Sequence, residues 1–187
     1  KLSPLIDIQH LVSSLKNICK IWIIAVKNEV KEVLVYLNKT ENQPEISCIN
    51  LQSTEPEFHF NLDDEKNCQS EFSIPKKYIY IPNNSVLKSG AFNLVSEKFG
   101  LRKLHQNTHI YTSEEKIEHF PGRIFETEEI NSKAIKKGEQ FNIITKNFPL
   151  KPEEIKKKYK IKDGGNQYLI AVKSLSGNHF LVGKLLD

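Results

Sequence analysis

The chain has 187 residues, a formal net charge of +4 and a hydrophobic fraction of 39%. This composition excludes collagen-like, low-complexity and wholly disordered proteins, and the length fits one domain or two small ones. The longest apolar run, at 21–26, is far shorter than the roughly 20 residues that span a bilayer. Residues 1–4 do not begin a signal peptide. The lysine at position 1 and the lack of methionine indicate a fragment.

The cysteines and the distribution of charge indicate the cellular location of the protein and the kind of partner it binds. The three cysteines, Cys19, Cys48 and Cys68, are odd in number and widely spaced. They predict neither a disulfide framework nor a metal site, so we expect a cytoplasmic location. Residues 1–75 contain 7 basic and 11 acidic residues, whereas 133–187 contain 12 and 5. This gradient favours an anionic partner such as nucleic acid.

The N-terminal part predicts one helix and several strands. Apolar residues at helical spacing over 8–16 follow Asp7, a residue that commonly caps helices. Two apolar runs, 21–27 and 33–37, predict an antiparallel hairpin. Further strands are expected at 45–51 and 58–62, and the polar segment 63–70 is expected to form an exposed loop.

The remaining sequence mixes helices with strands. A strand at 78–81 precedes a helix predicted over 85–99, capped by Asn84 or Ser85 and stopped by Gly100. Residues 105–113 are expected to be irregular. Pro152 begins a helix that has acidic residues first and lysines last, which suits the helix dipole. Strands are predicted at 122–129, 140–146, 167–174 and 179–185, with a short helix at 132–137 and a turn at 163–165. The pattern indicates an α+β fold.

Motifs for catalysis or cofactor binding are absent from the sequence. It contains no GxGxxG, GxxxxGK[ST] or GxSxG pattern. His105 and His109 lie four residues apart, but Gln106 replaces the glutamate of zinc enzymes, so loop histidines are the favoured interpretation. Adjacent carboxylates are expected to be solvated. We therefore assign no catalytic, cofactor-binding or metal-binding residue.

Several motifs together resemble a known family. These are KLSPLIDI at 1–8, VKNEVKE at 26–32, PNNSVLKSGAF at 82–92, KLHQNTHIYTS at 103–113, FPGRIFE at 120–126, and NFPL at 147–150 with KIKDGG at 160–165. Their order resembles the C-terminal half of a bacterial family of class I SAM-dependent methyltransferases, where SAM is S-adenosylmethionine. That family carries a ferredoxin-like insert and a THUMP-like C-terminal domain.

The resemblance implies three domains with different roles. Residues 1–75 would be the tail of a Rossmann-like methyltransferase core that ends in an antiparallel hairpin, 76–120 a ferredoxin-like unit, and 121–187 a THUMP-like domain. The SAM site would lie upstream, so this fragment alone would bind no SAM and would be inactive. Because THUMP domains are associated with RNA modification, the resemblance implies an RNA substrate, tRNA in particular, and a role in substrate recognition.

Basic residues supply the candidate RNA contacts. They are Lys88, Arg123, Lys146, Lys156, Lys157, Lys158, Lys160 and Lys162, with Lys151 close by and with Phe148 and Tyr159 as stacking candidates. The alternative is that Ile155 and Tyr159 form a buried stripe and the lysines are a solvated face. Arg123 could instead pair with Glu126 or Glu128. Two other functions stay open: methylation of a protein or small molecule with a purely structural C-terminal module, and a non-enzymatic interaction module.

Overall fold

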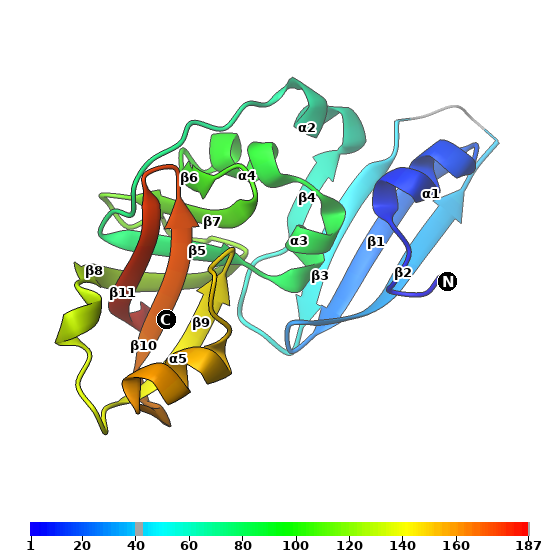
Figure 1. The fold of residues 1–187 in the computed structure, drawn as a ribbon. Helices are drawn as coiled ribbons and strands as arrows, with labels where there is room; N and C mark the ends of the chain where they lie inside the picture. The colour runs from blue at the N-terminus through cyan, green and yellow to red at the C-terminus, as the bar shows by residue number, and fades with distance from the viewer. Residues whose placement is uncertain (40–42, 187) are drawn as a thin grey trace. The chain divides into compact units, whose positions relative to one another are not determined.

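In the computed structural model, which describes residues 1–39 and 43–186, the chain packs as two compact units. Of the described residues, the first unit comprises those within 1–70, 82–99 and 118–122, and the second comprises those within 71–81, 100–117 and 123–186. Each unit combines segments from more than one of the three predicted ranges. The mixture of helices with two sheets confirms the α+β class (Figure 1).

The first unit is built on a four-stranded sheet in the order β2-β1-β3-β4. Here β1 pairs antiparallel with β2, as predicted for a hairpin, and parallel with β3. The elements are α1 (Ile8–Ser14), β1 (Ile18–Val26), β2 (Glu29–Leu37), β3 (Glu45–Leu51), β4 (Phe58–Asn61), α2 (Leu62–Asn67), α3 (Asn84–Ser89) and α4 (Phe92–Lys98). Asp7 caps α1 by accepting a hydrogen bond from the backbone N–H of His10, as its position predicts.

The second unit contains a seven-stranded sheet in the order β6-β7-β5-β8-β11-β10-β9. The elements are β5 (Tyr78–Pro82), β6 (Arg102–His105), β7 (Thr108–Ser113), β8 (Gly122–Ile130), a 3-10 turn (Ser132–Ala134), β9 (Gln140–Lys146), α5 (Pro152–Tyr159), β10 (Lys162–Ser174) and β11 (Gly177–Leu186). Leu169 and Ala171 of β10 are buried beside α5, and Ile170 and Val172 are buried in the cluster on the other face. Both faces of this strand are therefore core.

The structure corrects five predictions about local structure. The helix expected over 85–99 is two helices, because Gly90 takes a left-handed φ of 81° and ends α3. The residue that caps α3 is Asn83 rather than Asn84 or Ser85. The expected loop at 63–70 contains α2, and the expected irregular segment at 105–113 is part of the β6–β7 hairpin. The expected turn at 163–165 lies inside β10, where the pairing with β9 shifts between Asp163 and Tyr168.

None of the helices within residues 1–39 and 43–186 is long and apolar enough to cross a membrane.

Candidate nucleic-acid interface

The predicted lysines of α5 lie on the outward side of an amphipathic helix. Ile155 is fully buried, and the Tyr159 ring packs against Phe180 with 5.7 Å between the ring centroids. Lys157 and Lys158 are exposed, as are Lys160, which ends the helix with a left-handed φ of 54°, and Lys162 at the start of β10. The buried stripe that we considered as the alternative explanation is therefore present, and it accounts for the spacing of these lysines without any ligand.

Lys156 differs from its neighbours because two carboxylates hold its ammonium group. Its Nζ lies 2.6 Å from an oxygen of Asp163 and 2.6 Å from an oxygen of Glu153, and its side chain is 18% exposed. The hydrogen bond to Asp163, followed by that to Glu153, raises the pKa of Lys156 above its ordinary value. Its charge is thus balanced locally and is a poor candidate for a phosphate contact.

Two of the other predicted cations, Arg123 and Lys88, lie away from α5 in the sequence. Arg123 on β8 places its guanidinium 5.6 Å from the centroid of the Phe125 ring. Glu126, one of the acidic partners considered for Arg123, forms an ion pair of 3.1 Å with Lys77. Lys88 is in the last turn of α3 and belongs to the first unit, so it is not part of the surface formed by the second unit.

The second unit contains an open groove between the segment that joins β9 to α5 and the β10–β11 hairpin. It has a volume of about 420 Å³, and its lining includes Asn147, Phe148, Lys151, Lys173 and Asn178. No carboxylate is among the described residues that line it. We call this feature the basic groove. Of its residues, the sequence analysis singled out only Lys151 and Phe148.

Another predicted cation, Lys146, is not among the described residues that line the basic groove. It is the exposed last residue of β9 and pairs in register with Val172, so its side chain leaves the sheet on the side of Val172, whereas Lys173 lies on the other side. The pKa of His109 is lowered to about 4 by burial and then by the charges of Lys103 and Lys146. Because burial is the main cause, the shift reflects the apolar surroundings of His109 more than the nearby charges.

Short polar and aromatic contacts fix one wall of the basic groove. The Asn147 side chain donates a hydrogen bond of 3.0 Å to Thr108 Oγ1, which ties this wall to β7. Asn147 itself has a left-handed φ of 51°, a conformation that asparagine tolerates better than most residues. The Phe148 ring packs edge-on against Phe180, with the ring centroids 5.0 Å apart.

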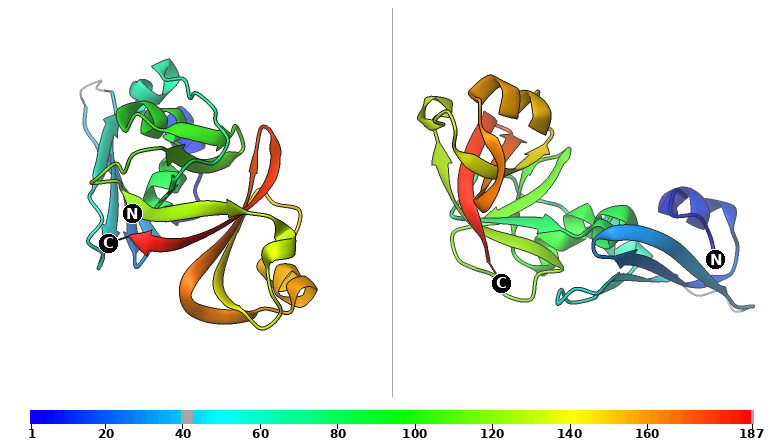
Figure 2. Two further views of the ribbon diagram at one scale, coloured as in Figure 1. Left: turned by 90° about the vertical axis from the view of Figure 1, so that its left-hand side faces the viewer. Right: turned by 90° about the horizontal axis from the view of Figure 1, so that it is seen from below.

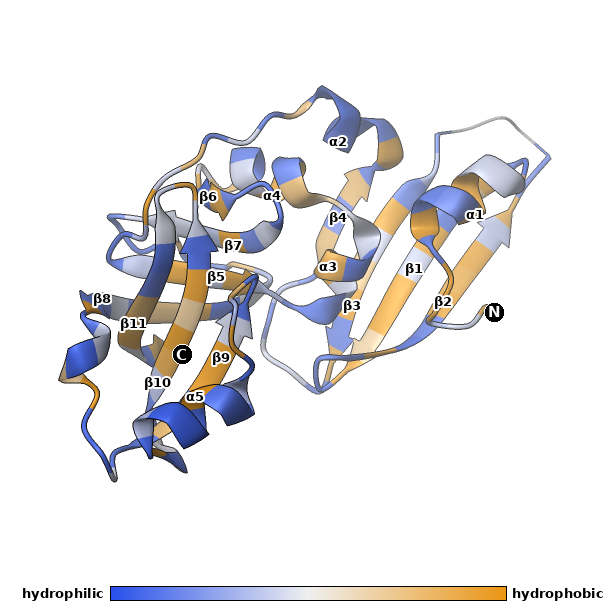
Figure 3. Cartoon of the chain, viewed as in Figure 1, coloured by the Kyte–Doolittle hydropathy of each residue, from blue (hydrophilic) through white to orange (hydrophobic). Residues whose placement is uncertain are grey.

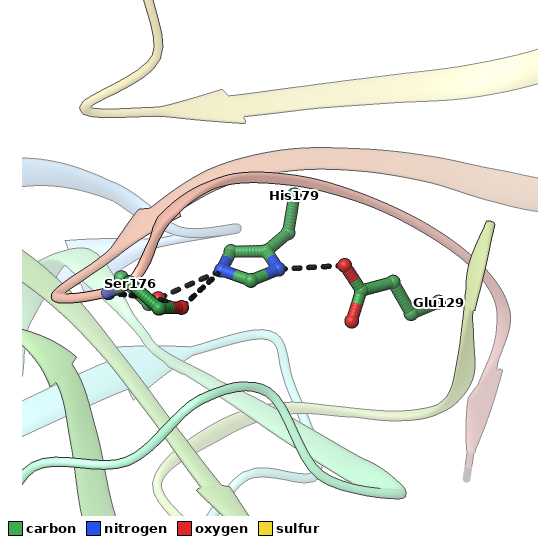
Figure 4. A network of polar contacts seen from close by, with 4 residues as sticks. Glu129, Ser176 and His179 are labelled. Carbon is green, nitrogen blue, oxygen red and sulfur yellow. Dashed lines mark hydrogen bonds and ion pairs between the residues drawn. The ribbon is translucent and has the colours of Figure 1, made fainter. Parts of the chain in front are cut away.

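A histidine network fixes the opposite wall (Figure 4). His179 Nδ1 lies 2.7 Å from Glu129 Oε1, and Nε2 lies 2.7 Å from Ser174 Oγ and 3.2 Å from Ser176 Oγ. The backbone N–H of Ser176 also donates to Ser174 Oγ. This atom order matches that of a serine nucleophile site, but the nearer hydroxyl, Ser174, is only 1% exposed. The network therefore holds the hairpin turn in place beside Asn178 and Lys173.

The two histidines considered for metal binding lie on neighbouring strands of a hairpin. His105 ends β6, where its Nδ1 accepts a hydrogen bond from the backbone N–H of Asn107, and His109 is in β7. Across residues 1–39 and 43–186, no three His, Cys, Asp or Glu side chains are grouped as metal ligands would be.

Comparison with known proteins assigns two segments to families. Residues 78–121 match the family model of a ferredoxin-like domain, and residues 122–183 match the model of a THUMP domain-like family. No curated protein matches the chain.

A solved structure resembles nearly the whole chain. It is the crystal structure of a protein described as a "putative methyltransferase" from Porphyromonas gingivalis W83, with 33% sequence identity and a TM-score of 0.85. The match covers 98% of this chain and 50% of the other, so the chain spans half the length of that relative. Residues 78–121 thus match a ferredoxin-like domain and residues 122–183 a THUMP-like domain, within a chain that is similar in fold to half of that protein.

Proposed function

We propose that this chain is the RNA-recognition part of a SAM-dependent RNA methyltransferase, and that tRNA is the RNA it binds. The observation that carries the proposal is the basic groove, which lies within the THUMP-like segment. Similarity to half of a methyltransferase supports the reaction class. Together they favour a recognition role over the two alternatives, a structural module and a non-enzymatic one.

In this proposal the lysines of the groove attract the RNA by charge, and its asparagines bind the RNA through hydrogen bonds. Lys151 and Lys173 would contact phosphates, which gives affinity and register but little sequence preference. The amide groups of Asn147 and Asn178 can donate and accept hydrogen bonds, so they would contact the ribose or the base edges. Contacts by Lys88, Arg123, Lys146 and the lysines in and after α5 stay predictions.

SAM itself is proposed to bind elsewhere in the enzyme. The eight glycines of this chain form no GxGxxG loop, so its sequence offers no glycine-rich loop of the kind that lies against the ribose of a nucleoside cofactor. When bound, SAM would supply an electrophilic methyl group. The residues described above would hold the RNA, and the chain on its own is expected to show neither SAM binding nor methyl transfer.

The test is tRNA binding, measured by fluorescence anisotropy over a series of salt concentrations. We expect affinity to fall steeply as salt rises, because phosphate contacts release counterions. The double variant Lys151→Glu with Lys173→Glu should weaken binding and reduce the slope of log K against log salt by about 2. The matched control is Lys136→Glu with Lys137→Glu, which makes the same charge change at exposed lysines outside the groove and outside the predicted RNA contacts.

The results separate the alternatives. Salt-independent or absent tRNA binding would favour methylation of a protein or small molecule, or a non-enzymatic role. Equal losses in both double variants would show that RNA binding depends on overall charge and not on the basic groove.

A further inference from the structure

An open sheet has two edge strands, and three of the four edges in this protein are protected against pairing. β2, at one edge of the four-stranded sheet, is bridged by Leu2, which exchanges backbone hydrogen bonds with Val33. β4, at the other edge of that sheet, has only four residues. β6, at one edge of the seven-stranded sheet, is flanked by 71–73, which bond to both backbone groups of Lys103. Short or covered edges of this kind prevent pairing with other chains.

The fourth edge, β9 in the second unit, has none of this protection. β9 is seven residues long and pairs with β10 on one side, and the described part of the chain places no strand on its other side. It contains no proline or glycine, and its one charged residue, Lys146, is the last. Figure 3 shows the hydrophobic colour along the middle of this strand. A long, unbroken and mostly uncharged edge strand is a template for pairing with another chain.

The exposure of the side chains indicates that the outer side of β9 is open. Ile143 and Ile144 pair in register with Leu169 and Ile170 of β10. Both β10 residues are 0% exposed, whereas both β9 residues are only partly buried, although they pack against the same two clusters. The helix α5 packs through Ile155 on one face of β9 and β10 (Figure 2), so it covers a face of the sheet and offers the edge no strand to pair with.

We propose that β9 pairs with β9 of a second copy of this chain, antiparallel and about a two-fold axis at Ile143, an inference that does not depend on the RNA-binding proposal. In this register Ile143 faces its own copy, Phe141 faces Thr145, and Gln140 faces Lys146. Like charges directly opposite each other would be unfavourable, and this register places none there. The strand is thus complementary to itself, as a two-fold contact requires.

The same geometry limits the assembly to two copies. A two-fold contact uses the β9 edge of both chains, and the remaining edges of the joined sheet are the two β6 strands, which 71–73 already flank. The assembly therefore closes as a dimer and does not extend into a fibre. One seven-residue strand from each copy makes a contact smaller than a standard protein interface, so we expect a dimer that dissociates on dilution.

Sedimentation equilibrium over a range of concentrations tests the dimer, in the 187-residue chain and in the polypeptide translated from its complete reading frame. We expect both to pass from monomer to dimer as the concentration rises, and the backbone amides of 140–146 to exchange hydrogen more slowly in the dimer. A monomer at every concentration would overturn the proposal, and so would a dimer in which these amides exchange as fast as in the monomer. Association of the short chain alone would also overturn it, because the rest of the polypeptide would then cover the edge.

Charge changes at the two ends of β9 test the register. Gln140→Lys would place a lysine opposite Lys146 of the other copy at two symmetry-related positions, so we expect the dissociation constant of the dimer to rise about fivefold. Adding Lys146→Glu should restore dimerisation, although the new lysine still faces Lys162 within its own chain. Gln106→Lys, the same change at an exposed turn residue between β6 and β7, is the control and should leave the dimer unchanged.

The comparison of these variants decides the register even if Gln140→Lys lowers the stability of the monomer. The repulsion from Lys162 is present in both the single and the double variant, so recovery in the double variant reports the contact between copies. Equal dissociation constants for Gln140→Lys and Gln106→Lys, or a double variant that stays as weak as Gln140→Lys, would contradict the proposed pairing.

Discussion

Nδ1 of His179 on β11 lies 2.7 Å from a carboxylate oxygen of Glu129 on β8, 50 residues earlier in the chain. On its other side the same imidazole contacts Ser174, the last residue of β10. One ring thus joins three neighbouring strands where the β10–β11 turn forms a wall of the basic groove. Because Asn178 and Lys173 face each other in that turn, the histidine controls their position without lining the groove.

Replacing His179 should therefore reduce both stability and RNA binding. We expect His179→Ala to lower the free energy of unfolding by about 1–2 kcal/mol, measured by urea titration, since it removes hydrogen bonds to a carboxylate and to a buried hydroxyl. tRNA affinity should fall as well. Glu128→Gln is the control, because it neutralises an exposed carboxylate next to Glu129. A His179→Ala protein with unchanged tRNA affinity would show that the wall does not depend on the network.

Neutralising Lys156 should have little effect on RNA. Its ammonium already contacts Glu153 and Asp163, so Lys156→Gln is expected to leave tRNA affinity within about twofold of the parent, while Lys173→Gln weakens binding clearly. The cost to stability should be small, as for an ion pair at the surface. Filter binding at low salt measures the first effect and thermal unfolding the second. Equal losses of affinity would place Lys156 among the phosphate contacts.

The sequence predicted most of the strands because their patterns are local. Apolar alternation marked β9, and the paired runs before and after the segment 28–32 marked the β1–β2 hairpin, which the register confirms. The division of the helix expected over 85–99 was missed because Gly90 fits a helical pattern as well as a left-handed end. The strands β6 and β7 were missed because their polar residues, such as Thr108 and Thr112, are buried by tertiary contacts.

The basic groove could be predicted only in part for a related reason. The cluster of lysines around α5 was visible in the sequence, and so were Phe148 and Lys151. Lys173 and Asn178 become neighbours of that segment only through the pairing of β9 with β10 and the β10–β11 turn. No local sequence pattern indicates that these two segments lie side by side in the fold. The pairing of Lys156 with Asp163 depends likewise on where β10 begins after α5.

His109 should make the stability of the second unit depend on pH. Its pKa is about 4 in the folded protein and near its ordinary 6.5 in the unfolded chain. Between these values the unfolded chain binds more protons, so stability falls as the pH drops from about 7 towards 4. Allowing for screening at a half-buried site, we expect a loss of about 1 kcal/mol between about pH 7 and about pH 5. His109→Asn should remove this part of the slope in urea titrations. An unchanged slope would assign the pH dependence to other groups.

Gly183 should tolerate no side chain, because β11 and β8 approach each other too closely there. A Cβ atom at this position would contact the backbone oxygen of Glu126 and lie 2.6 Å from Thr127 Cγ2, so the two strands would have to separate. We expect Gly183→Ala to lower the free energy of unfolding by about 1–3 kcal/mol, as overpacking does elsewhere. Lys184→Ala, at the next, exposed position of the same strand, should change it by less than about 0.5 kcal/mol. Since Gly183 pairs with Thr127 on one side and Tyr168 on the other, the separation should reach the core around Phe125. Urea denaturation of the two variants measures the difference, and equal stability would mean that β8 and β11 shift apart at little cost.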